Sequence, residues 1–119
     1  MKLPKSDAKV VERFADLVPH DPRVTTRKMF GNPAAFVNGN LFFGVFGAKI
    51  FVRLSATDVE RAGREGFGSF EPMPGRAMTG YAVIPDAVLR EPSRVDAWVG
   101  RSLKFAASLP AKKTKTARP

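Results

Sequence analysis

The middle of the chain carries the pattern that most restricts its fold. Asn38-Gly39 lies between two apolar stretches, AAFV at 34–37 and LFFGVF at 41–46. Asn-Gly is the preferred central pair of a tight β-hairpin, because both residues tolerate a positive φ. A further turn at Gly47-Ala48 would lead into a third apolar stretch. The pattern therefore predicts an antiparallel β-meander.

The third stretch, KIFVRL at 49–54, shows the alternation of a strand that is buried on one face. Ile50, Val52 and Leu54 would share one side, and Phe51 and Arg53 the other. Two more segments, VTTRKMF at 24–30 and YAVI at 81–84, have the composition of strands.

Helices are expected on both sides of the meander in the sequence. Ser6 precedes an amphipathic run, with Asp7 in the first turn, where the helix dipole favours an anion. Ser55 and Asp58 resemble a capping box and predict a helix over 56–64. Residues 85–91 are expected to form a short helix with Pro85 in its first turn, and Ser93 is expected to cap the last helix. The predicted apolar stripes are Val10, Phe14, Leu17 and Val18 in the first helix, and Val95, Trp98, Val99, Ser102, Leu103 and Ala106 in the last.

These elements predict a single α+β domain over residues 1–110, in which helices flank an antiparallel sheet. The net charge of +9 is uneven, because the segment 111–119 holds four cations and no acid. We expect that segment to be a disordered basic tail. The chain has no cysteine and no apolar run long enough to span a bilayer, so we expect a cytoplasmic protein that does not enter membranes.

The sequence holds no recognisable set of catalytic or metal-binding residues. His20 is the only histidine, and cysteine is absent, so the usual zinc ligands cannot be assembled within one chain. Ser6, Ser55 and Ser93 are better explained as helix caps than as nucleophiles. We therefore expect no metal, no cofactor and no enzymatic activity.

The ten phenylalanines on a basic chain raise the question of nucleic-acid binding. Phe42, Phe43, Phe46 and Phe51 fall on adjacent predicted strands, but no RNA-recognition motif accompanies them. A small domain needs such side chains for its core, so burial is the main expectation. A remaining aromatic face stays open as an alternative.

The segment FEPMPGRAMTGY at 70–81 combines prolines, glycines and methionines in an unusual way. We expect Phe70 and Met73 to be buried, so that the segment forms a structural clip on the domain. Gly75 would permit a sharp turn. Arg76 is expected to be exposed, and is the candidate for anion binding within this segment.

Two tracts carry a family resemblance. RKMFGNPAAFVNGNLFFGV at 27–45 and FEPMPGRAMTGYAVIP at 70–85 resemble the N-terminal domain of the TfoX/Sxy family, over about residues 10–109. The resemblance implies an α+β domain with an antiparallel sheet. The namesakes are bacterial regulators of natural competence genes that act with the cyclic-AMP receptor protein at promoters. They carry a second helical domain, which we do not expect here, and many members have a second glycine where this chain has Asn32.

Three functions follow as hypotheses. The first is a non-catalytic regulatory or protein-interaction module with a protein partner, the transcription machinery included. The second is weak, charge-driven nucleic-acid binding, and the third is a small-molecule binder or enzyme with a pocket near Arg76. Both a monomer and a homodimer remain open. The candidate nucleic-acid or anion contacts are Arg27, Lys28, Arg53, Arg76, Lys112, Lys113 and Lys115.

Overall fold

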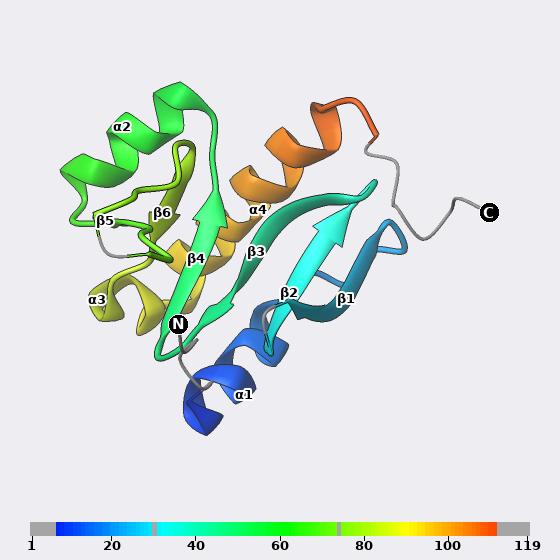
Figure 1. The fold of residues 1–119 in the computed structure, drawn as a ribbon, viewed down its shortest axis with the longest axis horizontal. Coiled ribbons are helices and arrows are strands. Elements are labelled where there is room, and N and C mark those ends of the chain that lie inside the picture. Colours follow the sequence, from blue (N-terminus) through cyan, green and yellow to red (C-terminus); the bar gives the residue numbers. More distant parts are fainter. Residues whose placement is uncertain (1–6, 30, 74, 112–119) are drawn as a thin grey trace.

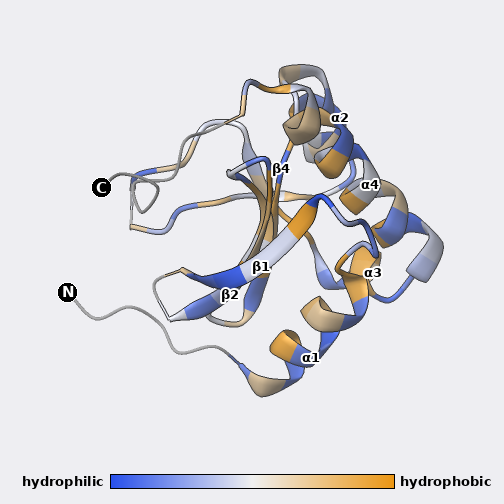
Figure 2. Ribbon diagram, turned by 90° about the vertical axis from the view of Figure 1, so that its right-hand side faces the viewer, coloured by the Kyte–Doolittle hydropathy of each residue, from blue (hydrophilic) through white to orange (hydrophobic). Residues whose placement is uncertain are grey.

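An antiparallel sheet forms the centre of the molecule. A computed structural model describes residues 7–29, 31–73 and 75–111, and in these ranges six strands lie in the order β1-β2-β3-β4-β6-β5 (Figure 1). The helices pack on one side of the sheet, and no described helix covers the other (Figure 2). The expected α+β class is confirmed. The elements are α1 (Ala8–Leu17), β1 (Val24–Met29), β2 (Asn32–Val37), β3 (Asn40–Phe46), β4 (Lys49–Arg53), α2 (Ala56–Arg64), β5 (Gly68–Ser69), β6 (Tyr81–Val83), α3 (Asp86–Leu89) and α4 (Pro92–Ser108).

The expected meander forms around the Asn-Gly hairpin. Asn38 and Gly39 have φ values of 53° and 80°, which is the left-handed conformation that this turn requires. The meander also includes β1, which pairs with β2 after a turn at Gly31. The sequence Gly31-Asn32-Pro33 predicts a turn after the strand at 24–30, but Asn32 and Pro33 belong to β2. The Asn32 side chain is buried, and its Oδ1 accepts a hydrogen bond from the Gly47 N–H at 3.1 Å.

Strand β3 contains a β-bulge that places two consecutive phenylalanines in the same core. Ala35 pairs with Phe43, whereas the next residue of β2, Phe36, pairs with Leu41. Phe42 is therefore the extra residue of the bulge. Both Phe42 and Phe43 are fully buried in the cluster that faces the helices.

At the bulge, α4 donates a hydrogen bond to the backbone of β3. Ser102 is the buried polar residue in the apolar stripe of α4, and its Oγ donates a hydrogen bond to the Phe42 carbonyl at 2.6 Å. A buried carbonyl without such a donor would carry a desolvation penalty. Ser102 thus fixes α4 against the sheet at the bulge.

Replacing Ser102 by alanine is expected to lower the free energy of unfolding by about 1–3 kcal/mol, because the buried Phe42 carbonyl loses its donor. The control is Ser108→Ala on the same helix. Ser108 also donates to a carbonyl at 2.6 Å, but it is exposed, so its loss should stay within about 0.5 kcal/mol. Urea unfolding of both variants measures the difference. Equal destabilisation would contradict a role for burial.

The main core lies between the sheet and the helices. It includes the expected faces of β4 and of both amphipathic helices, so those predictions are confirmed. Phe43 joins α1 to the sheet through a ring contact with Phe14 at 4.7 Å, and Trp98 of α4 packs against Phe67 at 4.8 Å. The buried members are Phe14, Leu17, Ala35, Val37, Phe42, Phe43, Val45, Ile50, Val52, Leu54, Ala62, Phe67, Ala82, Ile84, Val88, Val95, Trp98, Val99 and Ala106.

The observed helix caps confirm one of the three predictions and correct the other two. Ser55 caps α2 and accepts the Asp58 N–H at 3.2 Å, as expected. Asp7 is itself the N-cap of α1, rather than a first-turn residue, and Ser6 lies outside the described residues. Helix α4 begins at Pro92, so Ser93 is not its cap; proline at the first position needs no N–H partner.

The turn before β1 is held by one acidic side chain. The Asp21 carboxylate accepts hydrogen bonds from the Arg23 Nε at 3.1 Å, from its NH2 group at 2.9 Å and from its backbone N–H at 2.8 Å. The guanidinium first, and then the backbone N–H, lower the pKa of Asp21 from 3.8 to about 2. Since the folded pKa lies below the unfolded one, this interaction stabilises the fold above about pH 4 and is lost as the pH falls through about 2.

An NMR titration of the Asp21 carboxyl carbon is expected to show a midpoint near 2. In Arg23→Ala the guanidinium is gone, so the midpoint should rise toward 3.8. If Arg23→Ala left the Asp21 midpoint unchanged, the guanidinium would not be its cause.

Candidate binding surface

The sheet face opposite the helices carries a second group of packed aromatic rings. The Phe70 ring stacks on the Phe51 ring with centroids 4.3 Å apart and planes at 11°. Phe46 meets Phe70 edge-on at 5.5 Å, and the Tyr81 ring lies 5.9 Å from Phe51. We call these four residues the aromatic cluster. Its members do not belong to the main core, so the expected burial of phenylalanines occurs on both sides of the sheet.

A glycine in β3 makes room for this cluster. Gly44 pairs with Phe51 across the β3–β4 ladder. A Cβ atom at Gly44 would lie 2.9 Å from Phe51 Cζ and 3.2 Å from Ala34 Cβ, both closer than normal contact. The Phe51 ring therefore lies flat over the backbone of β3, with Phe70 on top of it.

The segment from Phe70 to Gly80, which we call the clip, closes over the aromatic cluster. The Phe70 carbonyl accepts the Met78 N–H at 2.8 Å, and the Gly80 carbonyl accepts the Leu54 N–H at 2.8 Å. Gly75, with a φ of 78°, forms the reversal, and its N–H donates to Glu71 Oε1 at 3.2 Å. Two of these bonds close the segment on itself, and the Leu54–Gly80 bond attaches its end to β4, as expected for a structural clip.

The side chains of the clip correct one expectation and confirm two. Phe70 is buried and Arg76 is exposed, as predicted. Met73 is 45% exposed, so the prediction that it would be buried was wrong. Met73 pairs with Arg76 in an isolated bridge across the reversal at Gly75. Only the base of the clip reaches the aromatic cluster.

Two of the predicted basic residues lie over aromatic rings on this face. The Arg27 guanidinium is 4.2 Å from the centre of the Phe36 ring, and that of Arg53 is 5.6 Å from the centre of the Tyr81 ring. Burial raises the pKa of the Tyr81 phenol, while the charge and hydrogen bond of Arg53 act in the opposite direction. Tyr81 is therefore neutral at physiological pH. The rings hold both guanidinium groups in place and leave N–H donors for a ligand.

The other basic residues predicted to contact a nucleic acid or an anion lie in different parts of the molecule. Arg76 is exposed in the clip, the segment whose Phe70 ring stacks on Phe51 on the side of the sheet that also carries Arg53. Lys28 follows Arg27 in β1, and alternation along the strand directs it to the helix side. Arg27 and Lys28 are therefore adjacent in the sequence but lie on opposite faces of the sheet. Lys112, Lys113 and Lys115 lie outside the described residues, as does most of the tail expected to be disordered.

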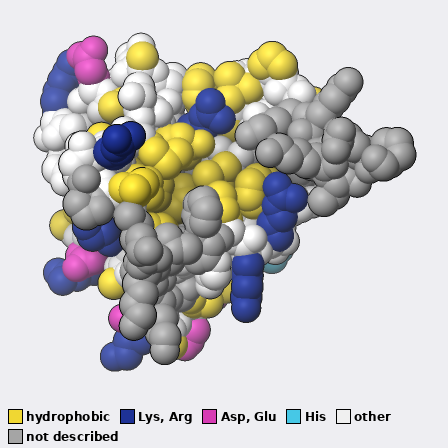
Figure 3. Space-filling model, viewed as in Figure 1, with side chains coloured by type: hydrophobic (Ala, Val, Ile, Leu, Met, Phe, Trp, Pro, Cys, Tyr) yellow, Lys and Arg dark blue, Asp and Glu magenta, His cyan; other side chains and the backbone are white. Residues whose placement is uncertain are grey.

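Ion pairs are distributed unequally over the two sides. In the described ranges they join Arg23 to Asp21 and otherwise involve helices α2 and α4 with their flanking residues. None of these pairs includes Arg27, Arg53 or Arg76. In Figure 3 hydrophobic side chains gather on this face, and Lys and Arg side chains lie beside them. The face combines an apolar centre with cations that have no carboxylate partner in this part of the structure.

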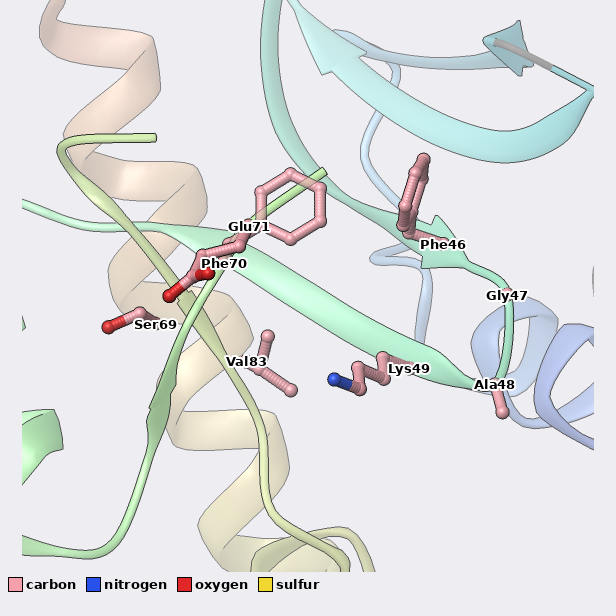
Figure 4. Close-up of a pocket in the computed structure, with 8 residues that line it drawn as sticks. All are labelled: Phe46, Gly47, Ala48, Lys49, Ser69, Phe70, Glu71 and Val83. Carbon is pink, nitrogen blue, oxygen red and sulfur yellow. The ribbon is translucent and has the colours of Figure 1, made fainter. Parts of the chain in front are cut away.

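A shallow pocket of about 480 Å³ opens at one end of the aromatic cluster. Phe46 and Phe70 line it together with Lys49, Ser69 and Glu71 (Figure 4). The third hypothesis placed a pocket near Arg76, but Arg76 does not line this one; Lys49 does, and the sequence had not singled it out. Within the described ranges, no group of three His, Cys, Asp or Glu residues could hold a metal ion.

Comparison with known protein families assigns the chain to one of them. The sequence model of the TfoX N-terminal domain family matches residues 12–106, and the chain belongs to that family. No curated protein matches the chain. Among the described helices, none has the length and apolar character needed to cross a membrane.

Proposed function

We propose that this chain is a non-catalytic, cytoplasmic binding module that recruits an anionic protein partner through the uncovered face of its sheet. The observation that supports the proposal is the set of arginines on this face, Arg27, Arg53 and Arg76, which have no ion-pair partner among the described residues. Arg27 and Arg53 lie over aromatic rings, and such guanidinium groups bind carboxylates with little loss of side-chain entropy.

Family membership adds a direction to this proposal. The chain belongs to the TfoX N-terminal domain family, and the namesakes of that family are competence regulators, so we propose a role in transcriptional regulation for the module. The partner would then present clustered carboxylates, and electrostatic attraction would speed its association with a chain of net charge +9.

An affinity experiment from the native extract tests the proposal. The full chain is the bait, with and without nuclease treatment, beside the double variant Arg53→Gln/Arg76→Gln. The control, Arg61→Gln/Arg90→Gln, removes the same charge from exposed arginines of the helix side. A nuclease-resistant protein should be recovered by wild type and control and lost with the first variant. Equal recovery by both variants would contradict the assignment of this face.

The same three arginines support nucleic acid as the second candidate partner. Three phosphate contacts predict a slope of roughly −3 in a plot of log affinity against log salt for duplex DNA, and the cations of the tail would steepen it. Binding should be weak and discriminate little between sequences, because phosphate contacts carry no sequence information. Titrations with promoter and scrambled duplexes at several salt concentrations measure both properties. Tight, selective and salt-insensitive binding would make nucleic acid the principal partner.

A further inference from the structure

Strand β1 is a terminal strand of the sheet, and its outer edge pairs with no other strand of the described ranges. The Val24 N–H donates to the Asp21 carbonyl at 2.9 Å and so points away from β2. Because N–H directions alternate along a strand, those of Thr26 and Lys28 also point outward. The pairing agrees, since Pro33, opposite Lys28, has no N–H to contribute. Within the described ranges no hydrogen bond reaches the outward N–H groups of Thr26 and Lys28.

This edge is accessible from both faces of the sheet. The four central residues of β1, from Thr25 to Lys28, are all exposed. The strand is six residues long and regular in its pairing with β2. In Figure 2 it is the edge turned toward the viewer, with α1 beneath it. An edge of this kind is a template for one more strand.

A groove runs beside the same edge, between β1 and α1. Its volume is about 480 Å³, and its walls are mainly apolar. Val11, Phe14 and Val18 contribute the α1 side, and Thr26 and Lys28 the β1 side. A chain paired with β1 would direct every second side chain into this groove, because residues opposite Thr26 and Lys28 share their face.

The charges around the groove indicate the chemistry of the occupant. Its lining contains two cations, Arg27 and Lys28, and no carboxylate. The nearby Asp21 is already bound by Arg23. Glu12 and Asp16 of α1 are exposed and do not line the groove. An occupant with acidic residues would therefore meet complementary charge along this edge.

We propose that β1 and the β1–α1 groove bind an extended segment of a partner protein in which acidic and aliphatic residues alternate. The segment adds a strand to β1, its aliphatic side chains enter the groove beside Phe14, and its acidic side chains face Arg27. This proposal rests on the proposed function, since it names a protein partner, but it uses the β1 edge and shares only Arg27 with the surface that contains Arg53 and Arg76.

A second copy of this chain is a poorer occupant of the same edge. Two β1 strands paired with each other would place two Arg27-Lys28 sequences on one ladder, and like charges on neighbouring strands are destabilising. Cations on an edge strand commonly prevent such self-pairing. The charge that disfavours a copy is the charge that selects an acidic segment.

The test uses the full chain and a fluorescein-labelled, end-capped peptide with the sequence Glu-Val-Glu-Val-Glu-Val-Glu. Fluorescence anisotropy gives the affinity, and amide exchange measured by NMR gives the location. The acidic peptide should bind at least tenfold more tightly than the Lys-Val-Lys-Val-Lys-Val-Lys peptide. It should also slow exchange at Thr26 and Lys28, whose N–H groups point outward. Equal binding of both peptides, or protection of other strands instead, would overturn the proposal.

Two variants separate strand addition from general charge attraction. Thr26→Pro removes one outward N–H and leaves the β2 ladder in place, so peptide affinity should fall at least tenfold. Thr26→Val keeps that N–H and should bind within about twofold of wild type. Arg27→Glu, at an exposed position on the face of the acidic side chains, should also weaken binding at least tenfold and serves if Thr26→Pro fails to fold. Full binding by Arg27→Glu would overturn the proposal.

The outcome can be distinguished from that of the proposed function. Arg53→Gln/Arg76→Gln should retain the peptide, even though it loses the partner recovered from the extract. If the peptide fails to bind while that partner is still recovered, the inference fails and the proposed function stands. Sedimentation tests whether a second copy of the chain occupies the edge. A dimer in which the Thr26 and Lys28 amides are protected from exchange without peptide would overturn the proposal.

Discussion

Replacing Phe70 by alanine is expected to lower the free energy of unfolding by about 3–5 kcal/mol, because a buried phenylalanine is removed from a packed cluster. Phe70 is the only described residue of the clip whose ring reaches the sheet face, where it stacks on Phe51 at 4.3 Å and meets Phe46 at 5.5 Å. The melting temperature should fall by roughly 10 °C or more for a domain of this size.

The matched control is Arg76→Ala in the same segment. Arg76 is exposed and has no ion-pair partner among the described residues, so its removal should change stability by no more than about 0.5 kcal/mol. Thermal melts of the two variants give the comparison. A neutral Phe70→Ala together with an unfolded Arg76→Ala would show that the clip is held by a charge rather than by its aromatic anchor.

The second large effect is expected for Phe43→Ala, at about 3–5 kcal/mol. Phe43 is fully buried, and its ring contacts Phe14 of α1 at 4.7 Å. Removing the ring leaves a cavity between α1 and the sheet, so amide exchange in α1 should also accelerate. Phe43→Leu keeps most of the buried volume and should be clearly milder. If alanine and leucine were equally tolerated, α1 would not depend on this contact.

The sequence predicted best the elements that short-range signals define. The hairpin at Asn38-Gly39 and the helix 56–64 depend on a turn pair and a cap, and both are confirmed. Strand β5 was not predicted, because its two residues, Gly68 and Ser69, are too few to show an alternation. The start of α4 was placed late because Pro92 opens the helix without a side-chain cap.

The candidate surface could be predicted only in part. Arg27 and Arg53 were found from the sequence, but their positions over Phe36 and Tyr81 depend on the pairing of neighbouring strands. The alternation in 49–54 did separate Phe51 from the main core and was the available signal for a second aromatic layer. Met73 was misplaced because an irregular segment has no periodicity that assigns its side chains to one side.

The bulge at Phe42 also determines which face of the sheet the neighbouring residues of β3 occupy. Side chains alternate between the two faces along β3 except at the bulge, where Phe42 and Phe43 both face the helices. Deleting Phe42 would make the ladder regular and would leave Leu41 opposite Phe36 and Phe43 opposite Ala35. It would also remove one buried ring and the carbonyl to which Ser102 donates. The length of this strand is therefore under as strict a constraint as its composition.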